Sequence, residues 1–159
     1  MAVQTFHMVE HVAQTLQKFV LGSTSPHGLV GQLDLEWVHF AFNTVYLVLF
    51  VVIVALWLKV GHRFTTMAGS VAIFLIFGLL FQGWHQVEHS VKFIQFIDTG
   101  MQGTPGVAGR WVDGVVLHFL YNAAVYAPIA FVFFMCEFYK ESLNLLPGRK
   151  VQGISVGAA

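Results

Sequence analysis

Long apolar segments dominate the pattern of hydrophobic and polar positions along the chain. Three of them, residues 37–58, 65–84 and 115–136, are long enough to cross a bilayer, which takes about 20 residues of helix. A membrane-spanning sheet would instead show short segments of alternating polarity, and this sequence does not have that pattern. It therefore predicts three clear transmembrane helices.

The N-terminal segment, residues 2–21, follows a different pattern, with polar side chains over much of its surface. It lacks the basic stretch followed by an apolar core that is typical of a signal peptide. We expect a shorter polar helix that packs on the bundle or lies at the membrane interface. Glycines and prolines at 22–31 and 100–109 predict two loops, and the third helix is expected to run from residue 64 to residue 97.

Composition narrows the class of protein. Hydrophobic residues make up 57% of the 159 residues and charged residues 10%, with a net charge of zero. The chain is therefore no basic nucleic-acid binder, and we expect the lipid bilayer as its main partner. A single cysteine excludes a disulfide scaffold and a four-cysteine zinc site. The sequence indicates one membrane domain over residues 1–159.

Cationic residues predict the orientation. One end of the spans carries several lysines and arginines, whereas Arg110 is the lone cation of the glycine- and proline-rich loops. By the positive-inside tendency, the 59–64 loop and the C-terminus face the cytoplasm and the two loops face outward. The cations that set this orientation are Lys59, Arg63, Lys140, Arg149 and Lys150.

The chain contains an internal repeat, residues 4–48 and 82–127. Residues 4–22 match 82–100 at an offset of 78, and an insertion in the loop then raises the offset to 79, which aligns Pro26 with Pro105. Each copy has a helix with His-x-x-Glu-His, a loop, and a spanning helix with His-x-x-x-Asn. We expect the spanning helices to begin a few residues before Asp34 and Asp113. Because two helices separate the copies, the repeats run in parallel around a pseudo-two-fold axis. The expected fold is an all-α integral membrane four-helix bundle built from two parallel helix-loop-helix repeats.

The repeat selects the candidate site. In His-x-x-Glu-His the polar side chains at i, i+3 and i+4 share one helix face. Counting from the loops places both copies at one depth, near the extracytoplasmic face. His27 and His62 have no counterpart and are left out. The repeated polar residues are His7, Glu10, His11, His39 and Asn43, and His85, Glu88, His89, His118 and Asn122.

These residues favour a metal site. Ionisable side chains at membrane depth usually face the bundle interior, where they are paired or bound to a ligand. Six imidazoles and two carboxylates are too many for one tetrahedral ion but suit two, and the carboxylates move the preference toward iron, manganese or zinc. We therefore expect a dinuclear iron site and redox or oxygen chemistry on a small or lipophilic substrate, with an electron donor. Asn43 and Asn122 are expected to form hydrogen bonds beside the ligands.

Three other interpretations stay open. A b-type haem between His39 and His118 would make the chain an electron-transfer subunit of a larger membrane complex. His-x-x-Glu-His is also the inverted zincin motif, in which the glutamate activates a zinc-bound water, so a membrane zinc hydrolase fits. Histidines that only brace helices would leave a non-catalytic accessory subunit. The two motifs resemble in a general way the histidine boxes of membrane di-iron desaturases and hydroxylases, at different spacings. Copper is a further candidate, because imidazole also suits that metal.

Overall fold

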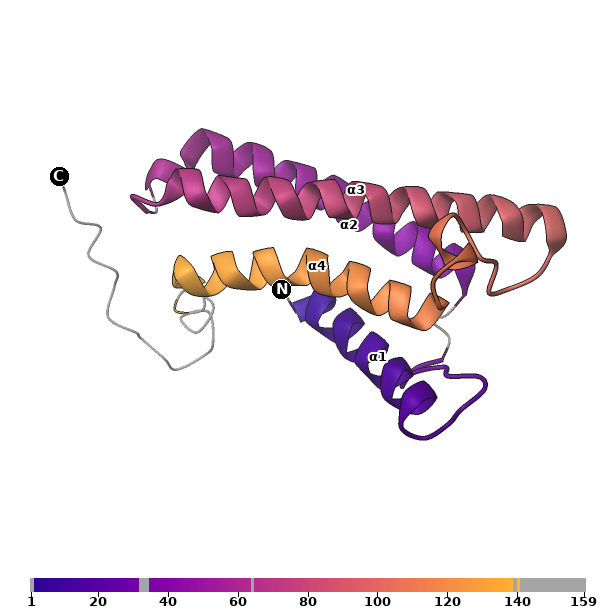
Figure 1. The fold of residues 1–159 in the computed structure, drawn as a ribbon. Helices are drawn as coiled ribbons and strands as arrows, with labels where there is room; N and C mark the ends of the chain where they lie inside the picture. The colour runs from indigo at the N-terminus through magenta and orange to yellow at the C-terminus, as the bar shows by residue number, and fades with distance from the viewer. Residues whose placement is uncertain (1, 32–34, 64, 139, 141–159) are drawn as a thin grey trace.

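The protein is all-helical. The computed structural model describes residues 2–31, 35–63, 65–138 and 140. Within them, four α-helices are joined by loops that include the short 3-10 helices Gly61–Arg63 and Ala108–Arg110 (Figure 1). The α-helices are α1 (Ala2–Phe19), α2 (Glu36–Val60), α3 (Ala68–Thr99) and α4 (Gly114–Met135).

The helices α2, α3 and α4 are long and apolar enough to cross a membrane, as the sequence predicted. Their outer faces carry many exposed aliphatic and aromatic side chains, whereas their buried positions include histidine, asparagine and glutamate. Such a distribution suits lipid, because ionisable groups at membrane depth are costly unless they face the bundle interior. The third helix was expected over residues 64–97. In the structure it runs from Ala68 to Thr99, so it continues well beyond the apolar span at residues 65–84.

Two expectations about helix starts are wrong. The spanning helices were expected to begin before the aspartates, but α2 begins at Glu36 and α4 at Gly114. Asp113 is the N-cap of α4, because its side chain accepts hydrogen bonds from the backbone N–H groups of Val115 and Val116. Asp34 lies outside the described residues.

The packing of the helices places both loops at one end. Helix α3 packs against both α2 and α4, and α1 packs on α4 (Figure 1). Helices α1 and α2 make little backbone contact with each other within the described residues. The loops that follow α1 and α3 lie at the same end of the molecule, opposite the turn between α2 and α3 (Figure 1).

The N-terminal helix buries its polar side chains instead of exposing them. His7, Glu10 and His11 are at most 4% exposed, whereas Phe6 and Leu16 on the outer face are about half exposed. Of the two expected placements of this segment, packing on the bundle is therefore the one that the structure has. The helix packs on the bundle through its polar face and presents an apolar face outward.

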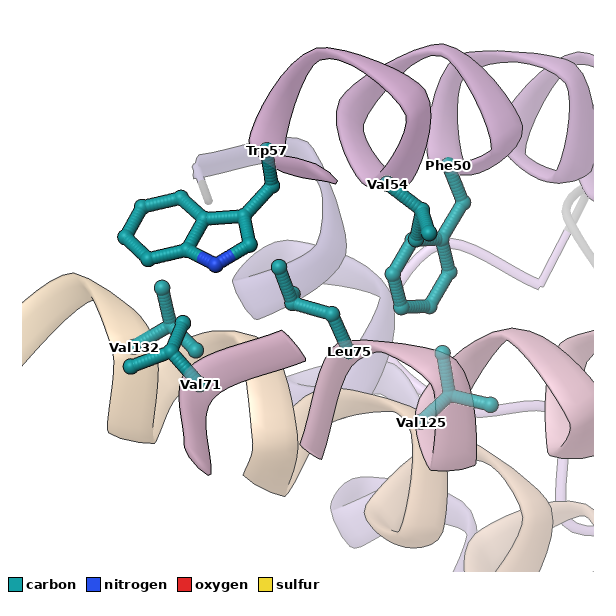
Figure 2. Close-up of a cluster of buried hydrophobic side chains, with 7 residues drawn as sticks. All are labelled: Phe50, Val54, Trp57, Val71, Leu75, Val125 and Val132. Atoms are coloured by element: carbon teal, nitrogen blue, oxygen red, sulfur yellow. The ribbon is translucent and has the colours of Figure 1, made fainter. Parts of the chain in front are cut away.

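An apolar core fills the end of the bundle away from these loops (Figure 2). Its side chains come from α2, α3 and α4, and Figure 2 shows them pointing into the space between the helices. Gly78 allows the close approach, because a Cβ atom there would lie 2.9 Å from Cζ of Phe50 and 3.4 Å from Cβ of Pro128. The buried members of the core are Phe50, Val54, Trp57, Val71, Leu75, Val125 and Val132.

Adding a methyl group at Gly78 tests this packing. Gly78→Ala should destabilise the protein by about 1–3 kcal/mol, the usual cost of overfilling a packed core, because Phe50 is only 1% exposed and must shift. Gly83→Ala is the matched control in the same helix, since a Cβ there meets no atom within 4 Å. Thermal unfolding in one detergent should show a lower midpoint for Gly78→Ala alone; equal midpoints would contradict the packing.

Candidate metal centre

The six repeated histidines form two groups of three. His7 and His11 of α1 join His39 of α2, and in the second group His85 and His89 of α3 join His118 of α4. Each residue offers one ligand atom, and the three atoms of a group lie within 4.8 Å of one another. Five of the six side chains are buried and His118 is partly buried. Both groups therefore have the composition and spacing of a site that could hold a metal ion.

The two groups adjoin each other in one layer of the bundle. The rings of His39 and His89 stack in parallel, with centroids 5.3 Å apart. The rings of His11 and His118 stack at a centroid distance of 5.9 Å. The structure thus brings together all six histidines that the sequence selected.

Within each group, the two histidines on one helix face each other through Nε2. These atoms are 3.1 Å apart in His7 and His11 and 3.0 Å apart in His85 and His89. This separation also fits an N–H···N hydrogen bond, so a pair by itself does not require a metal. The third imidazole of each group, together with the adjoining group, is what favours metal binding over a simple hydrogen bond.

Hydrogen bonds orient three of the rings, two of them through Nδ1. Nδ1 of His11 donates to Oε1 of Gln14 at 2.8 Å, and Nδ1 of His118 donates to the carbonyl oxygen of Gly114 at 2.6 Å. His39 makes a hydrogen bond to the backbone of Leu35. An imidazole that donates from Nδ1 keeps its lone pair on Nε2, which is the arrangement seen in most histidine metal ligands.

The α1 histidines are held in the neutral form. Burial, together with the neighbouring His11 and His39, lowers the pKa of His7 from 6.5 to about 2. Burial also lowers the pKa of His11, although its bond to Gln14 and the charge of Glu10 oppose the shift. Neutral imidazole is the form that coordinates metals, so these side chains need not lose a proton to bind an ion.

The second group has hydrogen-bonding capacity that no described side chain satisfies. Nδ1 of His85 and Nδ1 of His89 are buried without a partner, which costs about 1–3 kcal/mol for each unmade bond. At the position that corresponds to Gln14 at an offset of 78, α3 has Lys92, a residue with no acceptor atom. Lys92 instead donates to the carbonyl oxygen of Thr104 at 2.8 Å and lies 3.2 Å from Glu36. The two histidine groups therefore differ in their surroundings.

The carboxylates of the two motifs bind the loops. Glu10 accepts hydrogen bonds from the backbone N–H groups of Leu29 and Val30, at 2.9 and 3.0 Å. Glu88 accepts from those of Val107 and Ala108, at 3.0–3.3 Å. Neither carboxylate belongs to the two histidine groups. The sequence expected both as metal ligands or bridges, whereas the geometry gives them the task of holding the loops over the histidine layer.

Glutamine and glycine complete this anchor in both loops. Gln17 exchanges two hydrogen bonds of 2.8 Å with the backbone of Gly28, and Gln95 does the same with Gly106, at 2.8 and 3.3 Å. Both glycines have positive φ, and a Cβ atom there would overlap Glu10 or Glu88. These contacts pair Gly28 with Gly106 at an offset of 78. The alignment of Pro26 with Pro105 therefore placed the insertion too early in the loop.

Asparagine and glutamine connect neighbouring helices one turn from the histidines. Each asparagine donates to the backbone carbonyl of its own helix's histidine, Asn43 to His39 and Asn122 to His118, at 2.9 Å. Oδ1 of Asn43 accepts from Gln82 at 3.1 Å, and Oδ1 of Asn122 accepts from Gln4 at 3.1 Å. The glutamines were missed as site residues, although their recurrence at an offset of 78 was a signal for them.

A polar cavity of about 540 Å³ connects the loop end to the histidine layer. Four of the six histidines line it, together with Lys18, Lys92 and Glu36. His27, which the sequence analysis left out, also lines the cavity and forms a 2.8 Å hydrogen bond with Ser25. A small polar solute can therefore reach the layer from the loop side. The histidines in its wall are His11, His39, His89 and His118.

The loop anchors should stabilise the protein without any metal. Glu88→Gln replaces an acceptor oxygen by an N–H₂ group that faces backbone N–H donors, so the metal-free protein should lose about 1–3 kcal/mol of stability. Asp98→Asn, at an exposed position of the same helix, is the control. Unfolding would be measured in excess chelator. If Glu88→Gln left this stability unchanged and lowered only the metal content, the glutamate would be a ligand instead.

Alanine at two loop glycines separates backbone strain from overlap with the carboxylate. Gly103 and Gly106 both have φ near +70°, but only Gly106 has side-chain atoms close to an added Cβ. Gly103→Ala should cost about 1–2 kcal/mol from left-handed strain, and Gly106→Ala should cost more because Glu88 must also move. Equal losses in the thermal unfolding of the two variants would argue against the anchor.

Comparison with protein-family models, with curated proteins and with solved structures found no match to this chain. Its function is therefore argued from the geometry and chemistry of the site itself.

Proposed function

We propose that this chain is a small integral membrane metalloprotein that binds two transition-metal ions through its six repeated histidines. The observation that carries the proposal is the convergence of two three-histidine groups in one buried layer. Ionisable side chains are rare at membrane depth and usually mark a functional site. Each group supplies three ligands and leaves coordination positions for a small molecule.

The donor set widens the choice of metal. The expectation of iron depended on Glu10 and Glu88 as ligands, and both carboxylates accept hydrogen bonds from loop backbone. Imidazole alone suits copper, zinc and iron. We propose a redox pair of copper or iron ions, which exchange electrons with a small molecule such as dioxygen while an external donor restores them. The neutral histidines hold the ions, and the anchored loops form the wall of the cavity above them.

Matched contacts support the proposed parallel repeat and its pseudo-two-fold axis. The bond from Gln4 to Asn122 has its counterpart in the bond from Gln82 to Asn43. The anchors of the two loops likewise use the same residue types at an offset of 78. In this proposal each histidine group belongs to one repeat, and the two ions lie on either side of the axis.

The cations support a site toward the extracytoplasmic face. Lys59 and Arg63 lie at the turn between α2 and α3, at the end away from the histidine layer. Arg149 and Lys150, on which the orientation also depended, lie outside the described residues. By the positive-inside tendency we propose that this turn faces the cytoplasm, as does the C-terminus.

The geometry disfavours a haem between His39 and His118. Their ring centroids are 6.0 Å apart. His89 lies 5.3 and 5.1 Å from these two rings, and His11 lies 6.0 and 5.9 Å from them. Both imidazoles are thus almost equidistant from the proposed axial ligands, which places them near the plane that the macrocycle would fill.

A zinc hydrolase is also disfavoured. The inverted zincin mechanism needs the glutamate of the motif as a general base beside a zinc-bound water. In this protein both oxygens of Glu10 and of Glu88 accept hydrogen bonds from loop N–H groups. Neither carboxylate belongs to a histidine group, so the glutamate of the motif is engaged with a loop and is not placed as that base.

Metal analysis of single histidine variants tests the proposal. The purified protein should contain about two copper or iron ions per chain and show no porphyrin absorption. His39→Ala and His118→Ala remove one proposed ligand from different groups. Loss of a residue that only hydrogen-bonds to a ligand already lowers metal affinity about 10-fold or more, so loss of the ligand itself should lower the content toward one ion. His62→Ala, at an exposed position outside the layer, should keep both.

Three outcomes would contradict the proposed redox site with two metal ions. A preparation with zinc and no redox metal would exclude the redox role. A haem spectrum would exclude the two-ion site. Equal metal content in His39→Ala, His118→Ala and His62→Ala would show that the ions bind elsewhere.

A further inference from the structure

A second pocket lies between α1 and α2, on the side of the histidine layer away from the polar cavity. Its volume is about 190 Å³. Four apolar side chains line it, and the imidazoles of His7 and His39 form its polar wall. Val3 and Phe6 at its rim are 67% and 50% exposed, so the pocket borders the apolar outer surface. Its lining residues are Val3, Phe6, His7, Val38, His39 and Phe42.

A hydrogen bond bridges the corresponding place between α3 and α4. At offsets of 78 and 79, Trp84 and Tyr121 stand where the first half has Phe6 and Phe42. Nε1 of Trp84 donates to the hydroxyl oxygen of Tyr121 at 2.7 Å. Phe6 and Phe42 cannot form such a bond, because neither side chain has a polar atom. Helices α3 and α4 also pack against each other, whereas α1 and α2 make little contact.

The aromatic contact to the histidine is the same in both halves. The ring of Phe42 lies 4.5 Å from that of His7, and the ring of Tyr121 lies 5.1 Å from that of His85. The halves therefore share the inner wall and differ at the outer rim. This difference opens one histidine group, and not the other, toward the apolar surface.

From this geometry we infer that the pocket between α1 and α2 binds a small uncharged apolar molecule that enters from the lipid and reaches the group of His7, His11 and His39. Its volume exceeds that of an engineered cavity of about 150 Å³ that binds benzene or xenon. A charged ligand would have no partner among the four apolar side chains, whereas dioxygen or a short hydrocarbon needs none.

The inference deepens the proposed function, on which its chemical consequence rests. Apolar molecules would arrive through this pocket, and polar solutes and protons through the cavity at the loop end. The two routes meet at His39, which lines both. The two metal positions would then differ in role, because only the first group borders the apolar pocket.

Xenon is the probe that tests the pocket. Crystals of the purified protein would be pressurised with xenon, and its position would be read from anomalous scattering. We expect a xenon peak within the pocket, beside the imidazole of His7. The variant Phe6→Trp with Phe42→Tyr copies the bridged half, and its peak should fall at least five-fold. The inverse variant, Trp84→Phe with Tyr121→Phe, should gain a peak beside His85.

The outcomes that would overturn the inference are distinct from those that would overturn the proposed function. No xenon at His7, in crystals that hold it elsewhere, would exclude the pocket, and so would an undiminished peak in Phe6→Trp with Phe42→Tyr. Metal content would be measured on the same preparations. Xenon at His7 in protein that takes up no metal would retain the pocket and refute the metal proposal. Two ions per chain without xenon would refute only the pocket.

Discussion

The structure depends on one constraint, which is that polar side chains buried in a bundle with an apolar outer surface must find partners within the bundle. Water cannot complete their hydrogen bonds at membrane depth. The chain meets most of this constraint in one layer, where imidazoles, amides and carboxylates contact one another or the loop backbone, and Nδ1 of His85 and of His89 are the exceptions among the imidazoles. The side chains of the apolar core at the other end of the bundle have no hydrogen bonds to satisfy, apart from the N–H of Trp57, and need only complementary shapes to pack. The polar layer is the part that requires particular residues in particular places, and it contains the two histidine groups that could hold a metal ion.

The loops take part in this arrangement and do not merely connect helices. Glu10 and Glu88 are charged and buried, and the loops supply the N–H donors that compensate them. The glycines at 28 and 106 are needed where the backbone passes over the carboxylates. Each oxygen of these carboxylates accepts at least one hydrogen bond from the loop backbone. The two groups that could hold a metal ion consist of imidazoles alone.

Much of this could be predicted from the sequence, because helix length and side-chain spacing are local properties. The three spans, the polar residues of the layer and the grouping of His7 with His11 follow from periodicity and from the repeat. The role of the glutamates could not be predicted in this way. Helical spacing puts Glu10 on the face of its histidines, but only the path of the loop shows that its carboxylate is already satisfied. The burial of the polar face of α1 also depends on packing against α4, which periodicity alone does not give.

The two halves differ at two places beside the histidine groups. Lys92 replaces the acceptor that orients His11 in the first half, and the bridge by Trp84 and Tyr121 is missing between α1 and α2. A pair of equivalent ions would need neither difference.

The most direct test of the account is X-ray absorption at the K-edge of whichever metal the purified protein contains. The account predicts a first shell of nitrogen with the outer-shell scattering of imidazole, three rings for each ion. A first shell dominated by carboxylate oxygen, or the scattering pattern of a porphyrin, would contradict it.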